Sequence, residues 1–137
     1  MTLEKCVLVI DPELPVGVIA NTAAVLSLSI GRHRPQLIGD DLPDYAGHRR
    51  HGITTIPLPI LKGRQAALKA LRAAVKPHEP ALTVIDLIGA TRTTRSYSEY
   101  ADALATTPED ALDYLGIALL GPQKLVNQFT GSLGLLR

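Results

Sequence analysis

Short apolar runs alternate along the chain with stretches whose apolar residues recur at helical spacing. The runs are rich in Val, Ile and Leu, which is typical of strands that are buried on both faces. Because strands and helices alternate through short connections, the pattern predicts one α/β domain over residues 1–137, with a single sheet layered by helices. The predicted strands are 5–10, 53–61, 81–90 and 115–120, with a weaker candidate at 36–39, and the predicted helices are 15–31, 62–76, 96–104 and 123–129.

The predicted strand 53–61 differs from the others because it contains Pro57 and Pro59. Proline has no backbone N–H, and prolines two residues apart remove donors from the same side of a strand. We therefore expect this strand at an edge of the sheet, or extending beyond its paired part.

The predicted helix 15–31 contains no charged residue. A helix that is apolar on every face has to be covered on every face, so the pattern predicts a fully buried helix that begins near Pro15 and ends at Gly31. Asn21 and Thr22 are its polar exceptions. They either satisfy neighbouring backbone groups or line a ligand pocket, since open sheets often bind ligands near the first strand–helix junction.

The 14 basic and 13 acidic residues leave a formal net charge of +1, which argues against nucleic acid as a partner. The one cysteine, Cys6, lies in an apolar run, where we expect a buried, reduced thiol.

The first residues lack the features of a signal peptide, and 15–31 is shorter than the roughly 20 residues of a membrane span. We therefore expect a cytoplasmic protein without a membrane segment.

Motifs that carry chemistry are sparse in this sequence. It contains no nucleophile elbow, P-loop or dinucleotide fingerprint, and its histidines have no second ligand at a metal-binding spacing, so we expect no cofactor and no metal. Asp86 lies inside an apolar run, and a buried carboxylate needs a partner or a shifted pKa. Arg92 and Arg95 are the expected partners, in a structural ion pair or in a site where Asp86 is an acid. Asp102 is a further candidate, from the following helix.

The longest irregular stretch, residues 40–52, is first acidic and then basic. Its segment 48–51 has the sequence His-Arg-Arg-His. These cations either bind a phosphate or carboxylate, or belong to a solvated loop.

Both ends of the chain resemble a known family. Residues 5–11 and 14–25 resemble the first strand and helix of type II peptidyl-tRNA hydrolases, and residues 115–133 resemble their last strand and helix. A closer resemblance, through residues 52–61 and 114–122, is to a bacterial group, the domain of unknown function two thousand family. The resemblance implies a three-layer α/β domain with a mixed sheet of about four strands, helices on both faces, and a homodimer.

The hydrolases have a lysine after the first glycine of this helix, then glutamine and histidine. Here Val18 follows Gly17, the glutamine position falls on Thr22 or Asn21, and the histidine position falls on Val25. Loss of the lysine removes a cation that would stabilise developing negative charge.

We therefore expect a protein that keeps the hydrolase-like fold without the hydrolase activity and binds a small-molecule ligand or a protein partner. The alternative is a hydrolase that acts on peptidyl-tRNA or a related anionic substrate with a rearranged active site, in which a cation such as Arg92 or Lys124 replaces the lysine. The catalytic residues stay unassigned, and the candidate ligand-binding residues are Asn21, Thr22, Asp86, Arg92 and Asp102.

Overall fold

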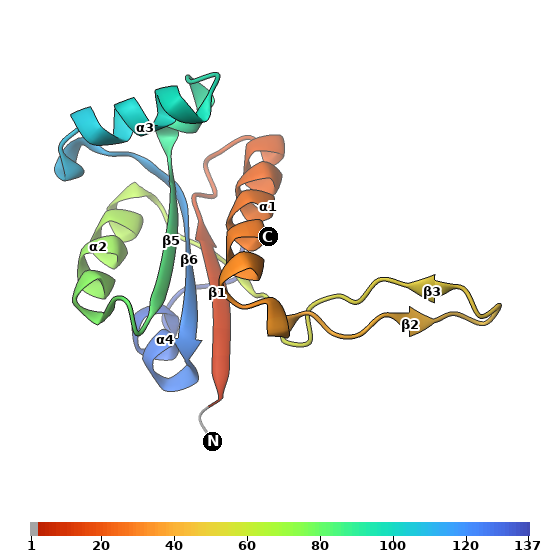
Figure 1. Ribbon diagram of the computed structural model, residues 1–137. Helices are drawn as coiled ribbons and strands as arrows, with labels where there is room; N and C mark the ends of the chain where they lie inside the picture. The colour runs from red at the N-terminus through yellow and green to blue at the C-terminus, as the bar shows by residue number, and fades with distance from the viewer. Residues whose placement is uncertain (1–2) are drawn as a thin grey trace.

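A mixed four-stranded sheet forms the centre of the computed structural model, which describes residues 3–137 (Figure 1). Its strand order is β4-β1-β6-β5, with β1 parallel to β4 and both β1 and β5 antiparallel to β6. The two central strands, β1 and β6, carry the most buried runs, because helices cover both of their faces. The strands are β1 (Glu4–Ile10), β4 (Ile60–Lys62), β5 (Thr83–Ile88) and β6 (Tyr114–Pro122).

Helices cover both faces of the sheet, which confirms the predicted α/β architecture (Figure 1). Alternate residues of β1 point to opposite faces, so that Leu8 packs in the cluster with α1 while Val9 packs in the cluster with α2 and α4. α3 lies across one end of the sheet (Figure 1). The helices are α1 (Val16–His33), α2 (Gln65–Val75), α3 (Tyr97–Thr106) and α4 (Gln123–Thr130), with short 3-10 turns η1 (Pro35–Leu37), η2 (Lys76–His78), η3 (Gly89–Arg92) and η4 (Glu109–Ala111).

α1 is not the fully buried helix that its sequence predicts. Thr22, Leu26 and Ile30 are buried against the sheet, but Val16 is 83% exposed and Leu28 is 80% exposed on the other side. A sheet face carries one layer of helix, so the outer side of that helix meets solvent unless another element covers it. The exposed residues of α1, which we call the α1 face, are Val16, Gly17, Ala20, Asn21, Ala24, Val25, Leu28, Arg32 and His33. The α1 face is uncharged as far as Leu28 and basic at its carboxyl end.

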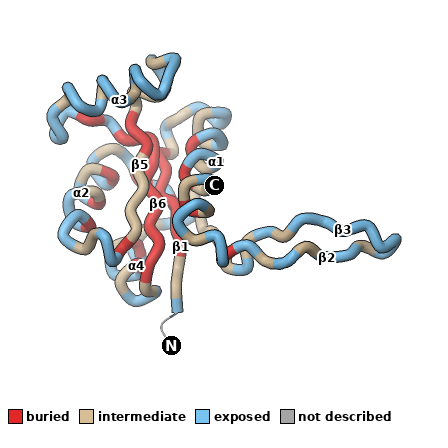
Figure 2. The backbone as a smooth tube through the Cα atoms, viewed as in Figure 1, coloured by how far each residue is buried: buried red, intermediate tan, exposed pale blue. Residues whose placement is uncertain are grey.

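A hairpin projects from the domain between α1 and β4 (Figures 1 and 2). We call residues 40–52 the arm. Its strands β2 (Leu42–Pro43) and β3 (Arg49–Arg50) pair antiparallel through two residue pairs, and all four residues are exposed. The stretch that the sequence marks as irregular is thus a defined hairpin.

Several element boundaries differ from the prediction. α1 continues past Gly31, which is helical here, to His33. Residues 36–39 form no strand, because the chain turns through η1 and makes a single bridge between Ile38 and Thr54. β4 lies at the sheet edge and pairs only after Pro59, as the prolines predict. α2 begins at Gln65 rather than at Lys62, which belongs to β4.

The thiol of Cys6 is buried, as predicted. Burial raises its pKa from 9.0 to about 11, which keeps it protonated and unreactive near neutral pH. Among residues 3–137, no helix has the length and apolar character needed to cross a membrane.

Candidate functional site

The carboxyl ends of β1 and β5 and the amino end of β6 meet at one end of the sheet. Open sheets bind ligands at the carboxyl ends of their parallel strands, because the following loops diverge there and leave a crevice. A cavity of about 650 Å³ opens at this position. We call it the end-of-sheet cavity, and its lining residues are Leu14, Gln65, Gly89, Ala90, Arg92, Thr93, Asp113 and Leu115.

Gln65, at the first residue of α2, holds one wall of the end-of-sheet cavity in place. Its Oε1 accepts the backbone N–H of Tyr114 at 2.9 Å, and its Nε2 donates to the Tyr114 carbonyl and to Oδ2 of Asp11, the latter at 3.1 Å. The other oxygen of Asp11, a residue only 7% exposed, accepts the backbone N–H of Glu13 at 2.9 Å. Both amide hydrogens of Gln65 are therefore used inside the protein, and its role is structural.

Arg92 is the cation of the end-of-sheet cavity. It is exposed at the end of η3, and it forms no ion pair or side-chain hydrogen bond with any described residue. Asp113 lines the same cavity, but its nearest cation is Lys69 at 3.9 Å. The Asp113 carbonyl accepts the Gly89 N–H at 2.7 Å, which joins the loop after β5 to the loop before β6. Arg92 is thus free to bind an anion.

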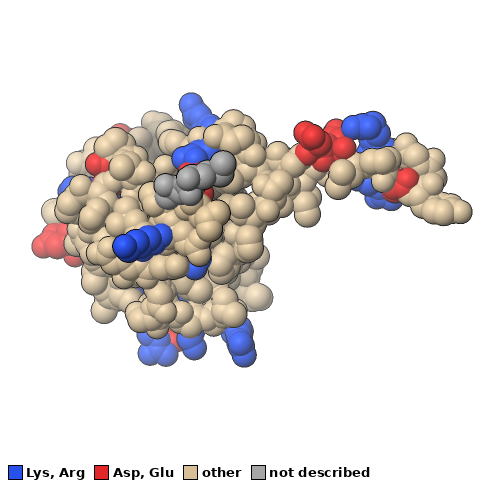
Figure 3. All heavy atoms as spheres, turned by 90° about the horizontal axis from the view of Figure 1, so that it is seen from below, with Lys and Arg blue, Asp and Glu red and all other residues tan. Residues whose placement is uncertain are grey.

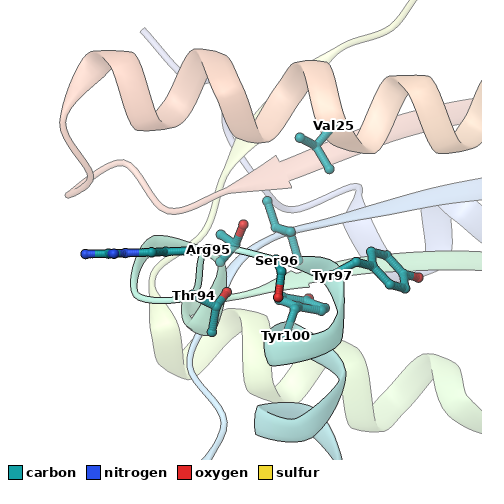
Figure 4. Close-up of a pocket in the computed structure, with 8 residues that line it drawn as sticks. Val25, Thr94, Arg95, Ser96, Tyr97 and Tyr100 are labelled. Atoms are coloured by element: carbon teal, nitrogen blue, oxygen red, sulfur yellow. The ribbon is translucent and has the colours of Figure 1, made fainter.

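A second cavity, of about 350 Å³, lies between α1 and the segment that joins η3 to α3 (Figure 4). Three of its polar side chains, those of Thr94, Ser96 and Tyr100, are engaged within the protein. Thr94 donates to the Ala90 carbonyl at 2.8 Å, and Ser96 caps α3 by accepting the Glu99 N–H at 3.1 Å, as the predicted capping box requires. The phenol of Tyr100 accepts the Ile88 N–H at 3.1 Å, and Arg95 extends away from Val25 (Figure 4). Arg95, like Arg92, is exposed and forms no ion pair or side-chain hydrogen bond with a described residue, but this cavity is the smaller of the two.

Asp86 is part of a charge cluster on the α2 side of the sheet. Arg72 of α2 donates to Asp86 at 2.9 Å and to Glu79 at 2.8 Å. Burial raises the pKa of Asp86, and the neighbouring Arg72 opposes that effect. The predicted partners Arg92 and Arg95 were wrong, because both lie past the end of β5 whereas Arg72 crosses its middle.

The five predicted ligand-binding residues lie in different parts of the fold. Of these, Arg92 lines the end-of-sheet cavity. Asn21 is exposed on the α1 face, and Asp102 is exposed on α3. Thr22 is fully buried, and its hydroxyl donates to the Val18 carbonyl at 2.8 Å. The structure therefore does not bring Asp86 together with Arg92.

Sequence reasoning missed three polar residues of the end-of-sheet cavity, Gln65, Thr93 and Asp113. Gln65 belongs to an ordinary amphipathic pattern, and Asp113 lies in a short turn that precedes a buried strand. Their position along the chain is the signal that could have found them. Polar residues next to the ends of neighbouring strands meet at one edge of the sheet. Within residues 3–137, no group of three or more His, Cys, Asp or Glu side chains is placed to hold a metal ion.

Comparison with known proteins identifies a family for this chain and a solved structure with a similar fold. Residues 4–137 match the family described as Protein of unknown function (DUF2000). The structure is similar to that of a protein of unknown function from Agrobacterium tumefaciens, with a TM-score of 0.89 and 21% sequence identity over 98% of each chain. At this identity the similarity shows a shared fold. No curated protein matches the chain.

Proposed function

The chain belongs to the DUF2000 family, and we propose that this member binds a small ligand with one anionic group in the end-of-sheet cavity. The observation that carries the proposal is Arg92, a cation that lines a cavity of about 650 Å³ and has no carboxylate partner among the described residues. A free guanidinium is suited to carboxylate or phosphate, because its planar N–H groups can bind two oxygens at once.

The rest of the lining supports a small ligand rather than a polyanion. Leu14, Ala90 and Leu115 supply apolar walls, and Asp113 places a negative charge in the same cavity as Arg92. A single cation compensates the charge of one anionic group, whereas a multiply charged backbone would need several cations. The net charge of +1 for the whole chain agrees with this choice.

We propose further that the fold is hydrolase-like and lacks the hydrolase activity. Where the resemblance places a catalytic lysine, the chain has Val18, which packs against the apolar cluster under α1. The second candidate function is a hydrolase of peptidyl-tRNA or a related anionic ester with a rearranged site. It is favoured by one observation, namely that Arg92 borders the same cavity as Leu14, which precedes α1.

The binding proposal is tested by thermal unfolding with inorganic phosphate, acetate or glycine, each compared with chloride at equal ionic strength. Ligands that bind only the folded state raise the melting temperature. We expect at least one of these probes to stabilise the wild type and Arg95→Ala equally and to lose its effect in Arg92→Ala. Arg95 is a matched control because it lies three residues away on the same segment. Failure of all three probes, or equal stabilisation of Arg92→Ala, would overturn the proposal.

The two candidate functions are separated by an assay with peptidyl-tRNA. Anion binding without turnover supports the binding protein. Turnover that is lost in Arg92→Ala and kept in Arg95→Ala supports the rearranged hydrolase and overturns the assignment as a binding protein.

A further inference from the structure

A third cavity, of about 530 Å³, lies between α2 and the segment that joins α3 to β6. We call it the α2–η4 cavity, and its volume is typical of a small-molecule site. Its lining comes from one side of α2, from η4 and from the first residue of β6. The lining residues are Lys69, Arg72, Ala73, Glu109, Asp110 and Tyr114, and none of them lines the end-of-sheet cavity.

The hydroxyl group of Tyr114 is the unusual feature of this cavity. Tyr114 is only 3% exposed, and its hydroxyl forms no hydrogen bond with any described residue. Among residues 3–137, every fully enclosed side-chain oxygen or nitrogen has a hydrogen-bond partner, so this hydroxyl reaches open space. The open space that Tyr114 borders is the α2–η4 cavity. Buried tyrosine hydroxyls usually have a partner, and this one is available to a ligand.

The surroundings of Tyr114 make its hydroxyl a hydrogen-bond donor. Burial raises the pKa of the phenol, and the charges of Asp86 and Glu109 raise it further, whereas Arg72 lowers it. The phenol therefore stays protonated near neutral pH. A protonated phenol presents its O–H to an oxygen acceptor of a ligand.

The unpaired charge of the α2–η4 cavity is negative. The cations that line it or contact its lining all have carboxylate partners, and the Asp110 carboxylate forms no ion pair or hydrogen bond with a described residue. Asp110 is exposed, so a ligand can reach it. The existing pairs are Arg72 with Asp86 at 2.9 Å and with Glu79 at 2.8 Å, Lys76 with Glu109 at 3.2 Å, and Lys69 with Asp113 at 3.9 Å.

The overall balance of charge at this cavity disfavours an anionic ligand. Its lining and the ion-pair partners of that lining contain five carboxylates and three cations. The arm differs, because acidic and basic side chains lie side by side along it and Asp44 pairs with Arg50 at 3.0 Å (Figure 3). An excess of negative charge attracts a cation and repels an anion. The end-of-sheet cavity has the opposite character, because its unpaired charge is that of Arg92.

We propose that the α2–η4 cavity binds a small amine that also carries an uncharged oxygen. The Tyr114 hydroxyl donates to that oxygen, and the Asp110 carboxylate faces the ammonium group. A ligand with the ammonium group alone leaves the buried hydroxyl without a partner, and a ligand with the oxygen alone leaves Asp110 uncompensated. The site thus selects molecules that have both groups.

An NMR titration with glycinamide hydrochloride tests the proposal, because glycinamide has an ammonium group and an amide oxygen. Sodium chloride at equal ionic strength is the reference. Acetamide lacks the ammonium group, ethylamine lacks the oxygen, and acetate is an anion. We expect saturable shifts of backbone amides in α2 and η4 with glycinamide, binding of acetamide and ethylamine that is weaker by about 3-fold or more, and no saturable shifts there with acetate.

Two pairs of variants locate the contacts. Tyr114→Phe removes the hydroxyl and keeps the ring, and it should weaken glycinamide binding by about 3- to 10-fold. Tyr97→Phe, at a tyrosine that is 87% exposed on α3, is the matched control and should bind as the wild type does. Asp110→Asn should weaken binding by about 2- to 5-fold, whereas Asp102→Asn, exposed on α3, should not. The amide spectrum of each variant verifies that it folds.

The Arg92→Ala variant separates this site from the end-of-sheet cavity, and it should bind glycinamide as tightly as the wild type. The absence of saturable shifts in α2 and η4 would overturn the proposal and show that the cavity holds water only. Unchanged binding in Tyr114→Phe, acetate binding as tight as that of glycinamide, or loss of binding in Arg92→Ala would also overturn it. None of these results depends on whether an anion binds at Arg92.

Discussion

Gln65 and Tyr114 are joined by two hydrogen bonds, one through the oxygen and one through the nitrogen of the Gln65 side-chain amide. Oε1 accepts the Tyr114 N–H at 2.9 Å, and Nε2 donates to the Tyr114 carbonyl. The contact connects the first residue of α2 to the first residue of β6, although 49 positions separate them in the chain. Through Asp11, the same amide reaches the end of β1. One side chain thus ties together three elements that surround the end-of-sheet cavity.

Replacing Gln65 with leucine should lower the free energy of unfolding by about 2 to 3 kcal/mol, because partly buried groups of Tyr114 and Asp11 lose their partner. Urea denaturation measures this change. Gln128→Leu, on the exposed side of α4, is the control and should shift stability by no more than about 0.5 kcal/mol. Equal effects of the two substitutions would contradict the structural role of Gln65.

Replacing Arg72 with methionine should lower the free energy of unfolding by about 3 kcal/mol. The substitution keeps the aliphatic stem and leaves Asp86 and Glu79 without their cation. Arg64→Met removes an exposed ion pair with Glu13 and should cost less than about 1 kcal/mol. Denaturant titration of both variants gives the comparison, and a small effect at Arg72 would show that the cluster adds little to stability.

Gly116 of β6 allows α1 to approach the sheet. A Cβ at this position would lie 2.9 Å from Cγ2 of Thr22 and 3.0 Å from the Val9 carbonyl oxygen. Gly116→Ala should therefore destabilise the protein by about 1 to 3 kcal/mol. Gly31→Ala, inside α1 with nothing within 4 Å of the new Cβ, should be neutral or stabilise it by up to about 1 kcal/mol. Thermal unfolding distinguishes the two signs.

Cys6 should make stability depend on pH in the alkaline range. Burial raises its pKa from 9.0 to about 11, so the unfolded thiol ionises first. The stabilisation from the protonated thiol is fully present below pH 9 and is lost as pH rises toward 11. The difference in unfolding free energy between wild type and Cys6→Ala should fall by about 1.4 kcal/mol per pH unit in that window. A difference that stays constant would show that Cys6 does not titrate as buried thiols do.

Local pattern predicted much of the fold because it reports which residues are apolar and how they are spaced. The runs that became β1, β5 and β6 are short and rich in β-branched residues, which favours strands of a sheet covered by helices. The Ser96 capping box and the prolines before β4 were also read correctly, since each acts through backbone groups within a few residues.

The candidate site was less accessible to the same reasoning. Its one predicted member is Arg92. This residue comes soon after the carboxyl end of a strand, and ligand crevices of open sheets form at such strand ends. Asp86 was assigned to arginines that follow its strand, whereas its partner Arg72 comes from α2, the helix that precedes the strand. Sequence distance is a poor guide to such a pair, because Arg92 is nearer in the chain but lies past the end of β5, whereas Arg72 lies on the helix that packs beside the strand.

The sequence by itself determined the α/β class, the buried thiol, the central strands and the position of a mostly apolar first helix. The tertiary structure decided that one side of this helix faces solvent, that residues 40–52 form a projecting arm, and that Gln65 and Arg92 share one cavity. The physical reason is that periodicity records the preference of each residue for burial, while the number of layers and the order of strands determine which surfaces are covered and which side chains meet.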